Sequence, residues 1–566
     1  MNQDNLVLID RGTQQASYAV NYSSGAHLIK FGGEYRFTKS DRVTANGIDP
    51  QFTFNGQITG NAFADFLLGR PFNMTQGSVR INRIRSQTYN LYVQDEWRLH
   101  RDFSLTLGLR YEPFFPYYSA DDELTVFRPG RQSTVFPSAP TGLLYVGDAG
   151  VSRGGTSSDL NNLAPRVSFA WSPFGNKKTS IRAAYGVFYD VLSFHKVSHF
   201  VNSPPYSLQV TANTPQSLSN PYAGQENPFP YAPPATAEEK AAYEFFRPVT
   251  IGLSVNPDQA APYIQQWNFN VQRELAQDYL LTVAYVGSKG TRLPIRNELN
   301  PAIYRPGATA GNTNARRIYA PNFASIIDYQ TVINSTYNSL QTTLNKRFSN
   351  GFTLLASHTW SKSIDGSSLE VDGFNGQNPL NLAAEKGRSD FDIRHRFVAS
   401  FLYQVPGPTA GWSKWILGGW QANGIFTAQS GSPFTVTSGQ DRALAGTGTQ
   451  RPDLVGNPHV DPNRSRAELI NQYFDPAVFA LPAIGTYGNA GRNLLIGPGR
   501  WNLDFALFKG FAIRENTNLN FRWEMFNSLN HANLNNPRSN ISAANPGRID
   551  SASDARVMQF GLRLAF

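Results

Sequence analysis

Two short segments of the chain carry the residue types that acid–base chemistry would use. His100-Arg101-Asp102 matches the start of a kinase catalytic loop, and residues 390–396 include Asp390, Asp392, Arg394, His395 and Arg396. The first triplet lacks the following asparagine and the glycine-rich loop that phosphoryl transfer requires. The second segment lies where a long loop enters a strand, so its charges are expected to form a salt-bridge network. We therefore predict no catalysis at either segment.

Two other signatures of enzyme and metal sites are missing from the sequence. There is no G-x-x-x-x-G-K-[ST] and no H-E-x-x-H. The absence of cysteine removes thiolate metal sites, disulfides and thiol nucleophiles together. We predict that the chain is not an enzyme and has no metal site and no cofactor.

Composition narrows the class of protein further. The 566 residues include 13% aromatic and 16% charged residues, a mixture that argues against disorder. The mean hydropathy is -0.37 and no apolar run approaches the ~18 residues of a membrane helix. The net charge of +9 is spread over scattered lysines and arginines rather than a basic run, so nucleic acid is not an expected partner.

The main physical signal is a strict alternation of apolar and polar residues. In residues 103–111, Phe103, Leu105 and Leu107 share one face, whereas Ser104 and Thr106 share the other. This period of two is typical of a strand with one apolar face. The Asn350-Gly351 dipeptide between two such segments is a strong hairpin signal. The alternating segments are 27–37, 89–98, 103–111, 167–171, 181–187, 267–271, 281–285, 340–348, 352–360, 397–403, 420–426, 501–507, 519–525 and 558–566.

Short and long connections alternate between these segments. The expected long loops are residues 39–85, 114–164, 191–262, 289–335, 364–392, 430–500 and 528–556. Two of them contain capping boxes, at Thr236 to Glu239 and Ser465 to Glu468, which predict short helices. Long loops at one rim and short turns at the other predict an all-β fold, an antiparallel transmembrane β-barrel with periplasmic turns and extracellular loops. We count about fifteen strands, and because such barrels normally close with an even number, we expect at least one more strand upstream of Met1.

Several of these segments resemble the Oar-like TonB-dependent transporters. The resemblance lies in YNLYVQDEWRLHRDFSLTLGLRY (89–111), in YNSLQTTLNKRFSNGFTLLASHTWSKSID (337–365) and in SDFDIRHRFVASFLYQV (389–405). It extends to residues 262–290, 418–436 and 485–537, and it covers the chain from about residue 27 to Phe566.

The resemblance implies a 22-stranded barrel of the bacterial outer membrane, with an N-terminal plug inside it. In that family a TonB-contacting segment precedes the plug, often after a carboxypeptidase-regulatory-like domain. We interpret residues 1–566 as one barrel domain, the C-terminal portion of a longer transporter, which would contact TonB only through a plug region outside this sequence. The start Met1 to Asn5 has no basic stretch and apolar core, so we expect the signal peptide to lie upstream.

Three sets of residues are candidates for function. Charged residues on the polar strand faces are expected to point into the lumen, although they could serve only to solvate it. Aromatic residues of the loops are candidates for ligand contact, with packing of the loops on themselves as the alternative. The closing strand alternates apolar and polar residues, so one of its faces suits lipid. We expect this strand to be recognised by the barrel-assembly machinery. The lumen set is Glu34, Arg36, Arg110, Glu112, Arg182, Arg522 and Glu524, the loop set is Tyr206, Phe229, Tyr231, Tyr243, Phe245 and Phe246, and the closing-strand set is Met558, Phe560, Leu562, Leu564 and Phe566.

The leading hypothesis from the sequence is TonB-dependent uptake of a large nutrient such as an oligosaccharide, a peptide or a metal chelate. Residues 191–262 are the predicted ligand-capturing loop, and the expected surroundings are outer-membrane lipid and lipopolysaccharide. One alternative is a structural or adhesive barrel without active transport. Another is a soluble all-β carbohydrate-active enzyme, which would require a pair of carboxylates on a concave face.

Overall fold

One large antiparallel sheet forms most of the protein. The computed structural model describes residues 5–190, 199, 202–213, 215, 217–224, 226–368, 376–448, 450–514 and 517–566. The largest sheet has eighteen strands, and three of them, β7, β13 and β18, are additions from the loops, which leaves fifteen. Each of the fifteen except the last pairs antiparallel with the next along the chain, so the predicted all-β antiparallel fold is confirmed. The fifteen are β1 (Asn5–Ser24), β2 (His27–Asn46), β5 (Arg80–His100), β6 (Phe103–Tyr111), β10 (Leu163–Trp171), β11 (Thr179–Tyr189), β14 (Tyr263–Ala276), β15 (Tyr279–Glu298), β16 (Phe323–Ser349), β17 (Phe352–Asp365), β19 (His395–Gln404), β20 (Trp420–Gln429), β25 (Arg500–Arg514), β26 (Thr517–Phe526) and β27 (Val557–Ala565).

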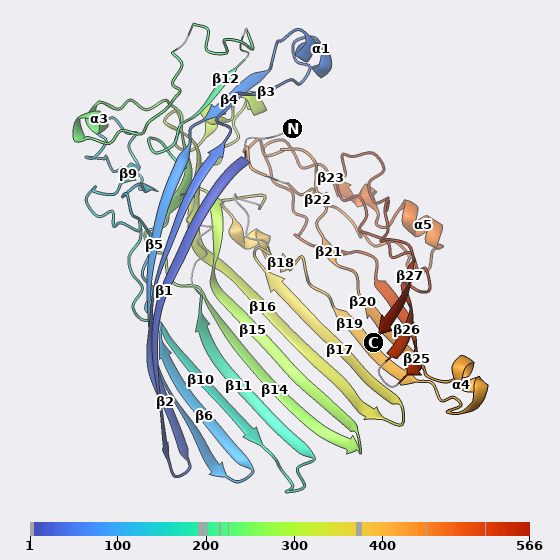
Figure 1. Cartoon of the computed structure of the whole chain (residues 1–566). Helices are drawn as coiled ribbons and strands as arrows, with labels where there is room; N and C mark the ends of the chain where they lie inside the picture. Colours follow the sequence, from blue (N-terminus) through green and yellow to red (C-terminus); the bar gives the residue numbers. More distant parts are fainter. Residues whose placement is uncertain are drawn as a thin grey trace.

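The two ends of this sheet differ in the length of their connections. At one end, here called the turn rim, strands are joined by short turns such as Gly25-Ala26, 277–278 and Asn350-Gly351. Asn350 and Gly351 have φ angles of 51° and 72°, the left-handed pair that a type I′ turn requires. At the other end, the loop rim, the connections are long and lie above the sheet in Figure 1. These loops are residues 47–79, 112–162, 190–262, 299–322, 366–394, 430–499 and 527–556.

Strand β1 is the one long strand that the alternation in the sequence did not predict. It pairs with β2 over its whole length, from Asn5 opposite Asn46 to Ser24 opposite His27. Its middle, Arg11 to Gln15, is polar on both faces, which hides the period of two. Among the pairs that the described residues form, β1 joins only β2 and β27 joins only β26, so these two strands are the edges of the curved sheet in Figure 1.

The two faces of the sheet differ in chemistry and in exposure. Leu91 on β5 is 61% exposed, whereas its neighbour Asn90 is 7% exposed. Side chains on a concave face shield one another, so the polar face is the inner face and the apolar face is the outer one. The register keeps this division from strand to strand, as in the outer row of Ala183, Phe269 and Tyr285. A soluble domain buries its apolar side chains and exposes its polar ones. Here the shielded inner face is polar and the exposed outer face is apolar, an arrangement that suits a protein surrounded by lipid.

Several strands continue past the sheet body into the region predicted as loop. β2 extends to Asn46, β15 extends to Glu298 and β16 begins at Phe323, so the corresponding loops are shorter than the sequence suggested.

None of the helices in the described part of the chain is long and apolar enough to cross a membrane. Both predicted capping boxes are formed, at the starts of α3 and α5. The smaller elements are β3 (Gln51–Thr53), β4 (Asn73–Gly77), β7 (Tyr118–Ser119), β8 (Thr125–Phe127), β9 (Leu143–Tyr145), β12 (Gln209–Asn213), β13 (Val249–Val255), β18 (Gly387–Arg388), β21 (Pro433–Phe434), β22 (Asp453–Leu454), β23 (Phe479–Ala480), β24 (Leu495–Ile496), α1 (Ala62–Leu67), α3 (Ala237–Ala242), α4 (Gly411–Leu417), α5 (Arg466–Asn471) and the 3-10 helices Ala310–Asn312, Asn314–Arg316, Leu382–Glu385 and Pro476–Val478.

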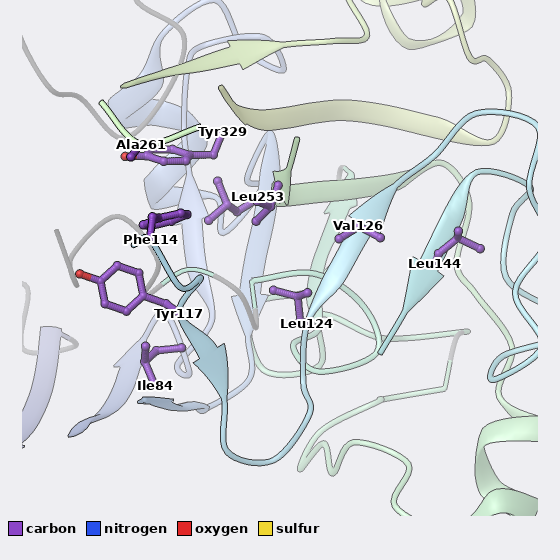
Figure 2. Close-up of a cluster of buried hydrophobic side chains, with 10 residues drawn as sticks. Ile84, Phe114, Tyr117, Leu124, Val126, Leu144, Leu253, Ala261 and Tyr329 are labelled. Carbon is purple, nitrogen blue, oxygen red and sulfur yellow. The ribbon is translucent and has the colours of Figure 1, made fainter. Parts of the chain in front are cut away.

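Most of the buried apolar residues lie in the loops, and they pack against the ends of sheet strands such as β5 and β16. One cluster joins Ile84 at the top of β5 to Leu124, Val126 and Leu253 of two different loops (Figure 2). A second surrounds Phe136, and a third surrounds Phe474 in residues 430–499. Strand β13 fixes the second cluster to the sheet by pairing in parallel with β16. The long loops are therefore a packed cap on the loop rim and not loose connections.

Candidate functional site

The predicted lumen residues of the first strands form ion pairs on the inner face. Arg36 donates to Glu34 at 2.6 Å on β2, and Arg110 donates to Glu112 at 2.5 Å at the end of β6. In each pair the partners are two residues apart, so the strand itself places them on one face. Asn90 on β5 lies opposite Glu34 and is buried between the two pairs. The sheet brings these four charged residues together near the loop rim.

The other three predicted lumen residues lie elsewhere on the inner face. Arg182 on β11 lines a cavity of about 690 Å³ near the turn rim, together with Glu96 and Arg98. On β26, the guanidinium of Arg522 lies 5.3 Å from the ring centre of Phe508, and Glu524 accepts a hydrogen bond from Gln559. The seven residues thus line different parts of the inner face and do not converge on one point.

Most of the predicted ligand-binding aromatics are packed against other loop residues. Tyr206 is 7% exposed and lies in the second buried cluster with Phe136. The Tyr231 hydroxyl donates to the Pro205 carbonyl at 2.6 Å and lies 3.3 Å from the Tyr243 hydroxyl.

The remaining three aromatics of that set differ in exposure. Phe245 packs against Tyr243, with ring centres 4.8 Å apart, and Phe229 lies 6.4 Å from Tyr222. Phe246 is 71% exposed. Of the six residues, Phe246 is the one that presents most of its surface to solvent.

Burial in the loop cap also changes the ionisation of its residues. Loss of hydration, and then the nearby Asp121 carboxylate, raise the pKa of Glu123 to about 7. Burial likewise raises the pKa of the Tyr145 hydroxyl well above its usual value. The Tyr145 hydroxyl donates to the Pro204 carbonyl at 2.9 Å, which holds the residues around Tyr206 against the cluster.

A buried ion pair ties two of the long loops together. Arg451 donates to Glu385 at 2.7 Å, and both side chains are 4% exposed. Glu385 also accepts from the Gln377 amide N–H at 3.0 Å, and Arg451 donates to the Ala490 carbonyl at 2.7 Å. The partners lie in residues 366–394 and 430–499, so this network connects the β17–β19 loop with the β20–β25 loop. Sequence reasoning missed it because neither residue belongs to a motif.

The charged segment at residues 390–396 is part of the same loop junction. Asp390 lies 3.4 Å from Arg492, and Arg492 also pairs with Asp365. Asp392 is 4% exposed and accepts from the Ser363 amide N–H at 2.7 Å. Among the described residues, Asp390 is thus the member of this segment that forms an ion pair, and its arginine comes from the β20–β25 loop and not, as expected from the sequence, from the segment itself. His100 is the last residue of β5, and Arg101 and Asp102 form the β5–β6 turn.

The closing strand presents its predicted residues on the outer face. Leu562 is 72% exposed, and it lies opposite Phe521 of β26. The register places Met558, Phe560 and Leu564 on the same face, opposite Met525, Trp523 and Leu519. Phe566 follows the strand and is 95% exposed.

Taken together, the inner face offers hydroxyls, amides and paired charges over many strands. Such a surface can hydrate a polar solute. In the part of the chain that the structure describes, no cluster of three or more histidine, aspartate or glutamate side chains could hold a metal ion.

Comparisons with known proteins agree with this architecture. A family model described as an outer membrane beta barrel domain matches residues 4–559, and no curated protein matches. The outer membrane transporter YddB from Escherichia coli is 11% identical, with a TM-score of 0.50, and the match covers 99% of this chain and 55% of that one. The ferric-catecholate import receptor Fiu from E. coli is 11% identical, with a TM-score of 0.43 and coverages of 99% and 55%. The ferripyoverdine receptor of the Pseudomonas aeruginosa outer membrane is 10% identical, with a TM-score of 0.45 and coverages of 99% and 48%.

The chain spans about half the length of these solved proteins. At such low identity the likeness to YddB concerns the fold. The family match extends over nearly the whole chain, and the sheet has the apolar outer face and polar inner face that a membrane barrel needs. This chain therefore belongs to the outer membrane β-barrel domain family.

Proposed function

We propose that this chain is the barrel of a TonB-dependent transporter of the Oar-like kind. Its cargo is a large nutrient such as an oligosaccharide, a peptide or a metal chelate. The observation that carries the proposal is the combination of a polar inner face with a connected cap of long loops at one rim.

In this proposal the loops capture the nutrient and the inner face passes it. Because Arg36 and Arg110 are each neutralised by a glutamate, the inner face near the loop rim carries charge without a strong net field. Such a surface hydrates polar solutes of either sign and does not trap them. Opening would require TonB to act on a plug region inside the barrel.

The other proposed partners follow from the outer face. Its exposed apolar rows contact outer-membrane lipid, with lipopolysaccharide at the loop rim. The closing strand, with Phe560, Leu562 and Phe566 exposed, is the proposed signal for the barrel-assembly machinery. No nucleic-acid partner is proposed.

Phe246 is the residue through which the loop cap can be tested for ligand binding. Deletion of residues 191–262 would also remove Tyr206, Val249 and Ile251 from a buried cluster, so a point substitution is the cleaner change. Phe246→Ser is expected to weaken binding about fivefold, the roughly 1 kcal/mol of a single interface contact. The measurement is binding and uptake of fluorescent maltohexaose, a fluorescent oligopeptide and a ferric hydroxamate by cells that carry the native gene, its deletion or the variant.

Phe174 provides the matched control, because it is 77% exposed but lies in the β10–β11 turn at the other rim. Phe174→Ser should leave binding unchanged. Loss of uptake of one probe on deletion, sensitive to a protonophore, would support transport. A control must show that the native protein is present in the outer membrane of the parent strain. If the deletion strain then takes up all three probes as well as the parent does, the results favour an adhesive barrel over a transporter.

A further inference from the structure

Helix α4 (Gly411–Leu417) distinguishes one turn of the turn rim from the others. The β19–β20 connection, residues 405–419, is the longest at this rim and projects beyond the sheet in Figure 1. Its sequence, GWSKWIL, places Trp412, Trp415 and Ile416 at positions i, i+3 and i+4, which share one side of a helix. Their exposed fractions are 77%, 50% and 59%. Exposed apolar side chains of this kind would not stabilise a turn that is surrounded by water.

The helix lies against the outer face of the barrel. The evidence is the position of Lys509 on that face and its contacts with the turn that contains α4. Along β25, Lys509 shares the outer face with Leu507 and Phe511, and it lies opposite Trp420 and Phe521 of the neighbouring strands. The same outer row continues to Leu562 on β27. Lys509 is therefore a charge in a row that otherwise faces lipid.

The turn containing α4 compensates for this charge. The Lys509 ammonium donates to the carbonyls of Ile416 and Gly418, at 2.9 and 2.7 Å, and the side chain is almost fully buried. Its Nζ lies 4.8 Å from the Trp420 ring centre, and the rings of Trp415 and Phe511 are stacked at 6.5 Å. Carbonyls at the C-terminal end of a helix favour a positive charge. The helix thus docks on the outer face through its C-terminal carbonyls and Trp415, while Trp412 and Ile416 stay largely exposed.

We infer that α4 is an anchor that lies in the interface of the periplasmic leaflet, with Trp412, Trp415 and Ile416 inserted among phospholipids. Three observations favour lipid over a soluble partner. The surface is continuous with the lipid-facing row of Trp420, Phe521 and Leu562. Its apolar residues include two tryptophans, which prefer the membrane–water interface. Lys414, the one charged residue of the helix, is exposed and can reach phosphate headgroups.

The inference requires the barrel to lie in a membrane but does not require it to transport anything. The test uses the absence of native cysteine. Trp412→Cys, in protein purified from outer membranes, is labelled with an environment-sensitive fluorophore and reconstituted in vesicles of phosphatidylethanolamine and phosphatidylglycerol. Lipids that carry a nitroxide at a shallow acyl position serve as quencher.

We expect quenching of the Trp412→Cys label to be several-fold stronger than that of a label at Asn176→Cys. Asn176 is an exposed polar residue in the β10–β11 turn of the same rim. Ile416→Cys supplies a second site on the same side of α4, in case Trp412 is needed for assembly, and it should also be quenched. Labels at 412 and 416 that are quenched no more than the label at 176 would overturn the inference, whether α4 then faces water or binds a periplasmic protein.

Discussion

Val283→Arg is expected to destabilise the folded barrel by about 2–4 kcal/mol, the cost of a lipid-facing cation near the bilayer midplane. Val283 is exposed on the outer face of β15, opposite Val271 and Thr342. It lies only a few residues from the turn after β14, and at about 3.3 Å per residue this places it close to the centre of the apolar band. The measurement is the free energy of unfolding by denaturant in phospholipid vesicles.

The adjacent residue is the matched control for that substitution. Ala284 points to the inner face, opposite Asn270 and Gln341, where a guanidinium finds polar partners. Ala284→Arg should therefore cost much less than Val283→Arg. Equal costs for the two variants would contradict the assignment of inner and outer faces, and a larger cost for Ala284→Arg would reverse it.

Arg451→Ala is expected to cost about 3–5 kcal/mol of loop-cap stability, because it leaves the Glu385 carboxylate buried without its partner. Glu385 and Arg451 are both 4% exposed, so water cannot take the place of the lost charge. The effect should be local to the β17–β19 and β20–β25 loops. Hydrogen exchange of the amides around Gln377 and Glu385 measures it.

Two further variants separate this effect from a general loss of charge. Arg538 pairs with Asp550 at a surface site, where the side chains are 45% and 37% exposed, so Arg538→Ala should cost less than about 1 kcal/mol. The double variant Arg451→Met, Glu385→Gln removes both charges and should recover part of the loss. If Arg451→Ala leaves exchange around Glu385 unchanged, the ion pair does not hold the loops together.

Much of the sheet could be predicted from the sequence, because each strand has one face in an apolar solvent and one in a polar one. Apolar and polar residues therefore alternate along each strand, and a segment as short as Phe103 to Tyr111 is enough to recognise this pattern. The capping boxes at Thr236 and Ser465 are equally local and were also predicted correctly. Strand β1 was missed because residues 11–15 are polar on both faces, so its place depends on pairing with β2.

The loops could not be predicted in the same way, because their structure depends on contacts between distant residues. Glu385 and Arg451 are separated by 66 positions and belong to no motif. Tyr206 and Phe246 are both aromatic residues of the β11–β14 loop, yet one is 7% and the other 71% exposed. The docking of α4 was hidden too, since it requires Lys509 from a strand far along the chain.

The central claim is that this sheet spans the outer membrane with its loop rim outside the cell. Labelling of single cysteines on intact cells with a membrane-impermeant maleimide tests it most directly, because the chain has no cysteine of its own. The sites are Glu238→Cys in α3, exposed at the loop rim, and Asn176→Cys at the turn rim, each introduced into the native gene in its own host. The account predicts labelling at 238 on intact cells and at 176 only after the outer membrane is permeabilised. Labelling at 176 but not 238 on intact cells, or equal labelling of both, would contradict it.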